Sequence, residues 1–125
     1  MNEKIMRVLI ADDQPQVRSA LRLLLKQEPG IVVVGEASDA EQALELAAEQ
    51  QPDLVLLDWE LPGWDGSAAL VGLQAIQPGV VVIALSGRPE ACRAALAAGA
   101  DAFVSKGDPP ERLLMAVNDF RHRRR

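Results

Sequence analysis

Five short apolar runs alternate with five amphipathic segments along this chain of 125 residues. Each run has about the length of one strand, and each segment repeats its apolar residues at the spacing of a helix. Strands that alternate with helices in this way are joined as parallel neighbours by right-handed crossovers. The pattern therefore predicts an α/β fold with a five-stranded parallel sheet, doubly wound as (βα)5. The predicted strands are residues 8–11, 31–34, 54–58, 80–85 and 102–104.

The residues between the runs are typical of helix starts and stops. Pro15 suits the first turn of a helix, where its missing N–H is not needed, and Asp39 is a natural N-cap. Pro29-Gly30 and Pro78-Gly79 would end the first and third helices, because neither residue continues a helix well. The last helix is expected to follow Asp108 and to pack through Leu113, Leu114, Val117 and Phe120.

The third run, Leu54-Val55-Leu56-Leu57 followed by Asp58, indicates where a site would lie. A continuous apolar run is typical of a strand covered on both faces. Pro62-Gly63 and Asp65-Gly66 then favour a loop directly after it. Because open parallel sheets bind ligands along the carboxyl edge, Asp58 is predicted to stand at that edge.

Sheets of this size commonly have the flavodoxin-like strand order 2-1-3-4-5. That order would bring the carboxyl ends of the first, third, fourth and fifth strands together. The residues at those ends are Asp12, Asp13, Asp58, Ser86 and Lys106. The sequence therefore predicts three carboxylates, a hydroxyl and an ammonium group at one edge.

Three converging carboxylates repel one another by about 4 kcal/mol per pair at about 4 Å and an effective dielectric constant near 20. A bound cation would relieve that repulsion, and hard oxygen ligands with room for water favour Mg²⁺. Lys106 could hold a phosphoryl oxygen, and the Ser86 hydroxyl could donate a hydrogen bond beside it. A carboxylate that attacks phosphorus beside a metal ion forms an acyl phosphate.

The same residues resemble the receiver domain of two-component response regulators, which has the CheY-like fold. The resemblance covers essentially the whole chain. The stretch 105–114 also resembles regulators of the NarL/LuxR type, whose receivers precede a helix-turn-helix domain. The motifs are Asp12-Asp13, Asp58 followed by Leu61-Pro62-Gly63 and Asp65-Gly66, Ser86-Gly87, and Phe103 with Lys106.

The resemblance implies a role for each residue of the acidic site. Asp58 would be the phosphoacceptor and a ligand of Mg²⁺, and Asp13 would be a second direct ligand. The backbone carbonyl of Glu60 would complete the protein's share of the metal shell, and Asp12 would act through water. The phosphodonor would be a histidine kinase, a phosphotransfer protein or a small acyl phosphate.

The resemblance also implies a switch. Ser86 and Lys106 would contact the phosphoryl group, and Phe103 would turn into the space that the Ser86 loop vacates. The surface of helix 4, strand 5 and helix 5 would then change, and it could form a homodimer. DNA would be reached only through an output domain outside this chain. The domain would assist its own phosphorylation and autodephosphorylation without being a stand-alone enzyme.

Three positions depart from the usual pattern of the family. Gly107 follows Lys106 where proline is common, and Phe103 replaces a frequent tyrosine but keeps the ring. Glu60 adds an acid two residues after the acceptor, towards a site that is already anionic. None of these changes removes one of the implied roles.

Composition limits the class of protein. The length suits one domain, predicted as a receiver over residues 1–120, with 121–125 as the basic end of the last helix or a linker. Residues 1–120 hold all 18 acidic groups, so the body is a poor nucleic-acid binder. The start of the chain lacks a signal-peptide pattern and no apolar run could cross a membrane, which favours the cytoplasm. The single cysteine, Cys92, is interpreted as a packed residue.

Three alternatives remain open at this stage. A dehalogenase-type phosphatase also uses an aspartate nucleophile, but that family places it after the first strand. A flavodoxin-like electron carrier needs a hydroxyl-rich phosphate loop where Asp12-Asp13 stands. A receiver kept as a phosphorylation-independent interaction module would have the same fold, and only phosphoryl trapping would separate it from a switch. Trp59 and Trp64 are interpreted as packing or partner-contact residues.

Overall fold

A computed structural model describes residues 5–123 of the chain. Within these residues, five strands alternate with five helices. The strands are β1 (Met6–Ala11), β2 (Ile31–Ala37), β3 (Leu54–Asp58), β4 (Val81–Ser86) and β5 (Ala102–Ser105). The helices are α1 (Pro15–Lys26), α2 (Ala40–Gln50), α3 (Gly66–Ile76), α4 (Ala91–Ala98) and α5 (Pro110–Arg123).

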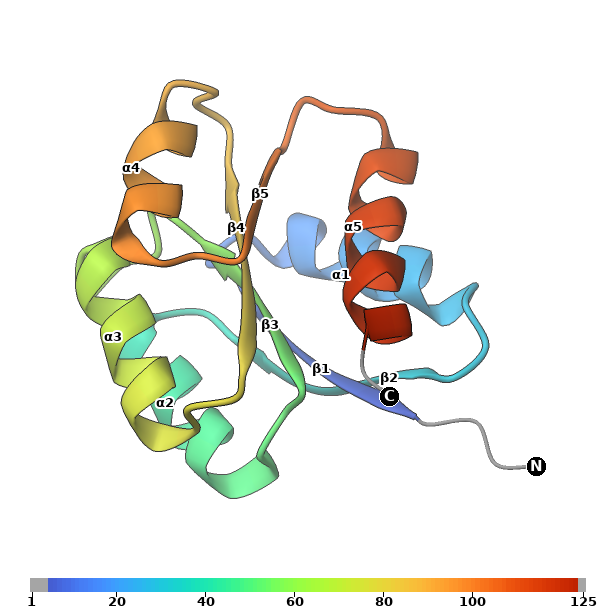
Figure 1. Ribbon diagram of the computed structural model, residues 1–125, viewed down its shortest axis with the longest axis horizontal. Helices are drawn as coiled ribbons and strands as arrows, with labels where there is room; N and C mark the ends of the chain where they lie inside the picture. Colours follow the sequence, from blue (N-terminus) through green and yellow to red (C-terminus); the bar gives the residue numbers. More distant parts are fainter. Residues whose placement is uncertain (1–4, 124–125) are drawn as a thin grey trace.

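All neighbouring strands are parallel, and their order is β2-β1-β3-β4-β5. Figure 1 shows the sheet nearly edge-on, with α2, α3 and α4 on one face and α1 and α5 on the other. The predicted fold class and strand order are therefore confirmed. The order places β3 at the centre of the sheet, where all five of its residues are buried.

The hydrophobic core has two parts, one on each face of the sheet. Side chains that alternate along a strand point to opposite faces. Val55 and Leu57 of β3 accordingly pack under α2, α3 and α4, whereas Leu54 and Leu56 pack under α1 and α5. Asp58 follows Leu57, so the same alternation directs its side chain to the α1/α5 face.

The second strand is longer than predicted, because its pairing with β1 continues to Ala37, and it contains a bulge. The pairing of β1 with β2 shifts between Val8 and Leu9, which leaves Val34 as an extra residue in β2. A bulge reverses the alternation of the side chains beyond it. Ala37 is thereby buried with the α2 core, and Glu36 is paired with arginines of α1.

The helix starts largely follow the predicted capping chemistry. Asp39 caps α2 by accepting a hydrogen bond from the backbone N–H of Gln42 at 2.8 Å. Asp65 caps α3 in the same way, so the predicted Asp65-Gly66 turn is also a helix start. α4 begins at Ala91, two residues after Pro89, because the segment between them forms a turn.

A glycine at the start of α3 allows close packing beside the site. A Cβ on Gly66 would lie 2.5 Å from the ring of Trp59, which packs against the core under α2, α3 and α4. The Trp59 side chain is therefore held directly after Asp58, as the packing interpretation expected. Trp64 is 46% exposed, and Cys92 is half-buried on α4.

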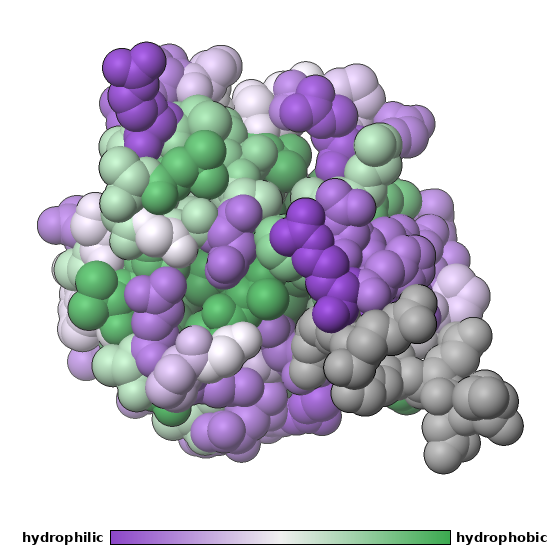
Figure 2. All heavy atoms as spheres, in the orientation of Figure 1, coloured by the Kyte–Doolittle hydropathy of each residue, from purple (hydrophilic) through white to green (hydrophobic). Residues whose placement is uncertain are grey.

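Figure 2 shows apolar residues gathered over α3 and α4 among more polar surroundings. α3 contains no charged residue, and Val71 on α3 and Leu96 on α4 are exposed. Among the described residues, no helix is long and apolar enough to cross a membrane. α5 continues through Arg121 to Arg123. The signal-peptide prediction also refers to residues 1–4, and the basic-end prediction to residues 124–125; both segments lie outside the described residues.

Candidate functional site

The alternation of side chains along the strands decides which polar groups meet at the carboxyl edge of the sheet. Asp12, Asp58 and Lys106 each stand two residues beyond a core residue on the α1/α5 face. Because residues two apart share a face, these three side chains converge there. The preceding core residues are Ile10, Leu56 and Val104.

Lys106 lies between two buried carboxylates. Its Nζ is 2.6 Å from Oδ2 of Asp12 and 3.5 Å from Oδ2 of Asp58. Asp12 is fully buried and Asp58 is 2% exposed. The backbone N–H of Lys106 donates to the carbonyl of Ser86 at 2.8 Å, which fixes the residue at the end of β5. One ammonium group thus neutralises part of a charge that would otherwise be costly to bury.

Backbone groups hold the other oxygen of each carboxylate. The N–H of Gln14 donates to Oδ1 of Asp12 at 2.9 Å, and the N–H of Glu60 donates to Oδ1 of Asp58 at 3.0 Å. Arg18 donates to the backbone carbonyl of Asp12 at 2.6 Å. The Oδ2 atoms of both aspartates therefore remain on the side of Lys106.

The donor set of the acidic cluster fits a hard divalent cation. Asp12, Asp13 and Asp58 each offer a carboxylate oxygen, and these atoms lie within 4.8 Å of one another. Asp13 is exposed, so the cluster is open to solvent on one side. The buried Oδ2 of Asp12 is held by the Lys106 ammonium at 2.6 Å. Oxygen ligands with room for water are those that Mg²⁺ prefers.

Burial raises the pKa of Asp58, and the backbone N–H of Glu60 and the Lys106 ammonium only partly offset this effect. Burial would lower the pKa of Lys106, but Asp12 and Asp58 prevail and raise it. A carboxyl group with a raised folded pKa favours folding at acidic pH, and this contribution is lost as the pH rises through that pKa. The ionised form of Asp58 therefore opposes folding, and a cation bound beside it would relieve this effect.

Ser86 lies at the same edge but on the opposite face of the sheet. Its hydroxyl donates to the carboxylate of Glu60, with both oxygens 2.9 Å from Oγ, and accepts from the backbone N–H of Arg88 at 2.9 Å. The guanidinium Nε of Arg88 is 3.6 Å from the same carboxylate. Phe103 is half-buried against the core under α2, α3 and α4, opposite Ala84 of β4.

The structure thus brings Asp12, Asp13, Asp58 and Lys106 together but places Ser86 with the Glu60 side chain. The involvement of Arg88 was missed in the sequence. The only sign in the sequence was the matching position of two opposite charges: Arg88 lies two residues after Ser86, and Glu60 lies two residues after Asp58.

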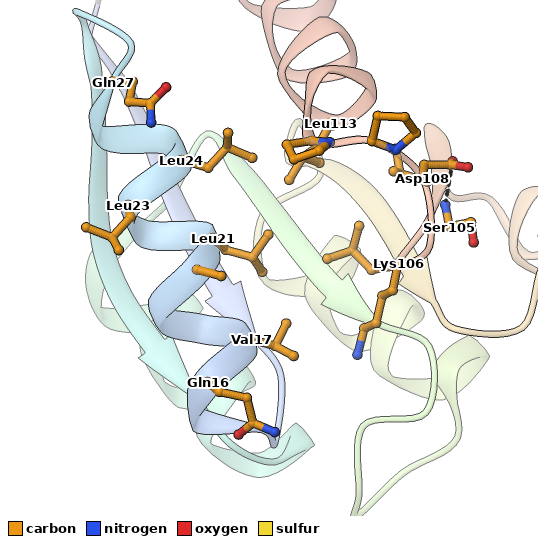
Figure 3. Close-up of a pocket in the computed structure, with 15 residues that line it drawn as sticks. Gln16, Val17, Leu21, Leu23, Leu24, Gln27, Ser105, Lys106, Asp108 and Leu113 are labelled. Atoms are coloured by element: carbon orange, nitrogen blue, oxygen red, sulfur yellow. Dashed lines mark hydrogen bonds between the residues drawn. The ribbon is translucent and has the colours of Figure 1, made fainter.

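A groove opens beside the site, between α1 and the segment that joins β5 to α5. Its volume is about 520 Å³, and its lining is mainly apolar. Figure 3 shows Val17, Leu21 and Leu24 of α1 facing the groove, with Leu113 of α5 across it and Lys106 at one end. The groove therefore provides an apolar surface next to the buried carboxylates.

A 2-1-3-4-5 parallel sheet with an acidic cluster and a lysine at its carboxyl edge defines the class of receiver domains. The family model of the response regulator receiver domain matches residues 8–118, and the chain belongs to this family. The relatives described next are named for different activities, and this chain matches only part of each of them.

The nitrate/nitrite response regulator protein NarL of Escherichia coli (strain K12) is 39% identical over 119 residues, which are 94% of this chain and 55% of that protein. The protein-glutamate methylesterase/protein-glutamine glutaminase of Symbiobacterium thermophilum is 41% identical over 107 residues, 83% of this chain and 30% of that protein. The chain therefore spans about half, or less, of the length of these curated relatives.

Two solved structures are similar over nearly the whole chain. A LuxR-family response regulator from Aurantimonas sp. SI85-9A1 superposes with a TM-score of 0.88 at 32% identity, covering 98% of this chain and 89% of that one. A LuxR-family DNA-binding response regulator from Staphylococcus aureus gives 0.84 at 27% identity, with coverages of 94% and 99%. The predicted similarity to the NarL/LuxR type is confirmed.

Proposed function

We propose that this receiver is a phosphorylation switch, in which Asp58 accepts a phosphoryl group in a reaction that depends on Mg²⁺. The observation that supports this most strongly is the position of Asp58. It ends the central strand, is 2% exposed, and shares its carboxylate between Lys106 and a cluster of oxygen ligands. A carboxylate kept at an energetic disadvantage in this way gains most from a new bond or a bound cation.

The proposed reaction transfers phosphorus between two nucleophiles. An oxygen of Asp58 forms a bond to phosphorus while the bond to the donor breaks, and the electron pair of that bond leaves with the donor. The donor is the phosphohistidine of a kinase or phosphotransfer protein, or a small acyl phosphate. Lys106 pairs with a phosphoryl oxygen and so offsets the charge that develops.

The residues proposed to hold Mg²⁺ are Asp13, Asp58 and the backbone carbonyl of Glu60, with Asp12 acting through water. When bound, the ion supplies positive charge next to the phosphoryl oxygens. The N–H of Leu61, which shares a peptide group with the Glu60 carbonyl, donates to the backbone carbonyl of Asp58 at 3.1 Å, and this supports a fixed position for the Glu60 carbonyl. A protein donor would lie over the groove beside α1, because that groove opens next to Lys106.

The proposed output is a change in the surface of α4, β5 and α5. A phosphoryl group of charge about −1.5 to −2 would attract Ser86 and Lys106, and Phe103 would turn towards the core. A shift from about 1:99 to 99:1 would need about 5.5 kcal/mol of differential stabilisation. The changed surface would control a transcriptional output domain, a partner protein or a homodimer, in the cytoplasm. The proposed receiver spans residues 1–120.

Labelling with acetyl phosphate tests the switch against a phosphorylation-independent interaction module. We expect intact-protein mass spectrometry to show one added phosphoryl group in the presence of Mg²⁺ and almost none with a chelator. We also expect slower hydrogen exchange over parts of α4, β5 and α5 in the labelled protein. A chain that takes up no label under these conditions would support the interaction module instead.

Tryptophan fluorescence should report Mg²⁺ binding in the Trp64→Phe variant, because Trp59 directly follows Asp58 and packs on Gly66. Asp13→Asn should weaken the apparent affinity for Mg²⁺ by at least about tenfold. Loss of a group that only hydrogen-bonds to a metal ligand already costs about tenfold, and Asp13 is proposed as a direct ligand. Asp119→Asn removes an exposed charge of α5 and serves as the control. Equal titrations of all three proteins would place the metal elsewhere.

A further inference from the structure

The Glu60 carboxylate accepts the hydrogen bond of the Ser86 hydroxyl, which the proposed switch needs for the phosphoryl group. Both of its carboxylate oxygens are 2.9 Å from Oγ of Ser86, and one is 3.6 Å from Nε of Arg88. Ser86 is fully buried, so its hydroxyl depends on neighbouring protein groups for its hydrogen bonds. These contacts join the loop after β3 to the loop after β4.

The hydrogen-bonding capacity of Ser86 makes this contact exclusive. A serine hydroxyl has one proton, and here that proton is shared between the two oxygens of Glu60. The backbone N–H of Arg88 donates to the same oxygen, which holds the loop after β4 against the hydroxyl. Ser86 can donate to a phosphoryl group only after Glu60 has left.

We propose that Glu60 is a carboxylate latch: in the unphosphorylated protein it holds Ser86 and Arg88, and it competes with the phosphoryl group on Asp58 for the Ser86 hydroxyl. This inference rests on the proposed function and adds to it a positioning residue that sets how readily the receiver responds. The Arg88 guanidinium is the second partner of the latch, because it is attracted by whichever anion lies closest.

The exposure of the side chains allows the latch to open without burying an unpaired charge. The side chains of Glu60 and Arg88 are 41% and 63% exposed, so both can turn into water. The backbone of Glu60 stays in place, since its N–H donates to Asp58. A phosphoryl group on Asp58 repels the Glu60 carboxylate at short range, and release of the side chain follows from that repulsion.

Glu60→Gln tests the latch because glutamine has the same length and can still accept a hydrogen bond. It lacks the charge that strengthens the bond to Ser86 and attracts Arg88. In the unphosphorylated protein we expect the Arg88 amide to exchange about fivefold faster, the difference between a charge-assisted and a neutral hydrogen bond. Labelling by acetyl phosphate should be faster by a similar factor. Glu90→Gln, at an exposed acid in the loop that contains Arg88, is the matched control for net charge.

A double-mutant cycle with Ser86→Ala separates the latch from a general effect of charge. In the Ser86→Ala background, Glu60→Gln should have a much smaller effect on amide exchange and labelling, because the shared hydroxyl is gone and only the loss of charge remains. Two results in a labelled wild type would contradict the latch but leave the proposed function intact. One is equal behaviour of Glu60→Gln and Glu90→Gln, and the other is a full effect of Glu60→Gln in the Ser86→Ala background. If wild type takes up no label, the proposed function fails and the latch fails with it.

Discussion

Asp58→Asn is expected to abolish phosphoryl uptake from acetyl phosphate. Asparagine keeps the size of the side chain and can still accept the N–H of Glu60, but its amide is not a nucleophile. Because burial raises the pKa of Asp58, loss of its charge should not lower the stability of the fold, and we expect an equal or higher melting temperature. Intact-protein mass spectrometry and thermal unfolding of the same sample measure both effects.

Asp119→Asn provides the matched control for this variant. It makes the same chemical change at an exposed position of α5, and it should be labelled like wild type. Equal labelling of wild type and Asp58→Asn would assign the acceptor role to another carboxylate, with Asp12 and Asp13 the nearest candidates. A large drop in melting temperature would contradict the view that ionised Asp58 opposes folding.

The fold was predictable because each level of the sequence points to the same architecture. Apolar runs, proline and glycine breaks, and the Asp39 cap all agree on alternating strands and helices. The bulge in β2 was not visible, since Val34 is as apolar as its neighbours and only pairing with β1 makes it an extra residue. The predicted strand was too short because residues 35–37 also pair with β1.

The membership of the acidic site was also predictable, because strand order alone brings the strand ends together. The alternation of side chains along the strands also predicts which groups of the site meet. It places Asp12, Asp58 and Lys106 on one face of the sheet and Ser86 on the other. Contacts made by loop side chains lie beyond this reasoning. Glu60 was expected to add negative charge to the acidic site, whereas its bond to Ser86 depends on the conformations of two loops.

Lys106→Met should have the second large effect, on stability as well as on signalling. The sequence alone places Lys106 at the same edge as the carboxylates but does not show that two of them are buried beside it. In the structure its ammonium is 2.6 Å from the fully buried Asp12, so methionine would leave two buried carboxylates without it. We expect a loss of about 2–4 kcal/mol in the free energy of unfolding in urea, slightly below the range for fully buried pairs because Lys106 is 22% exposed.

Mg²⁺ should distinguish this electrostatic loss from a defect in packing. A cation bound by Asp13 and Asp58 would replace part of the missing charge, so added Mg²⁺ should stabilise Lys106→Met more than it stabilises wild type. Lys26→Met, at an exposed lysine near the end of α1, should unfold like wild type with and without the ion. Since Asp58 and the proposed ligands remain, some labelling should persist, but hydrogen exchange over β5 and α5 should change little on phosphorylation. A variant as stable as wild type would show that Lys106 does not balance the buried carboxylates, and a variant with the full exchange response would show that Lys106 does not link the phosphoryl group to β5.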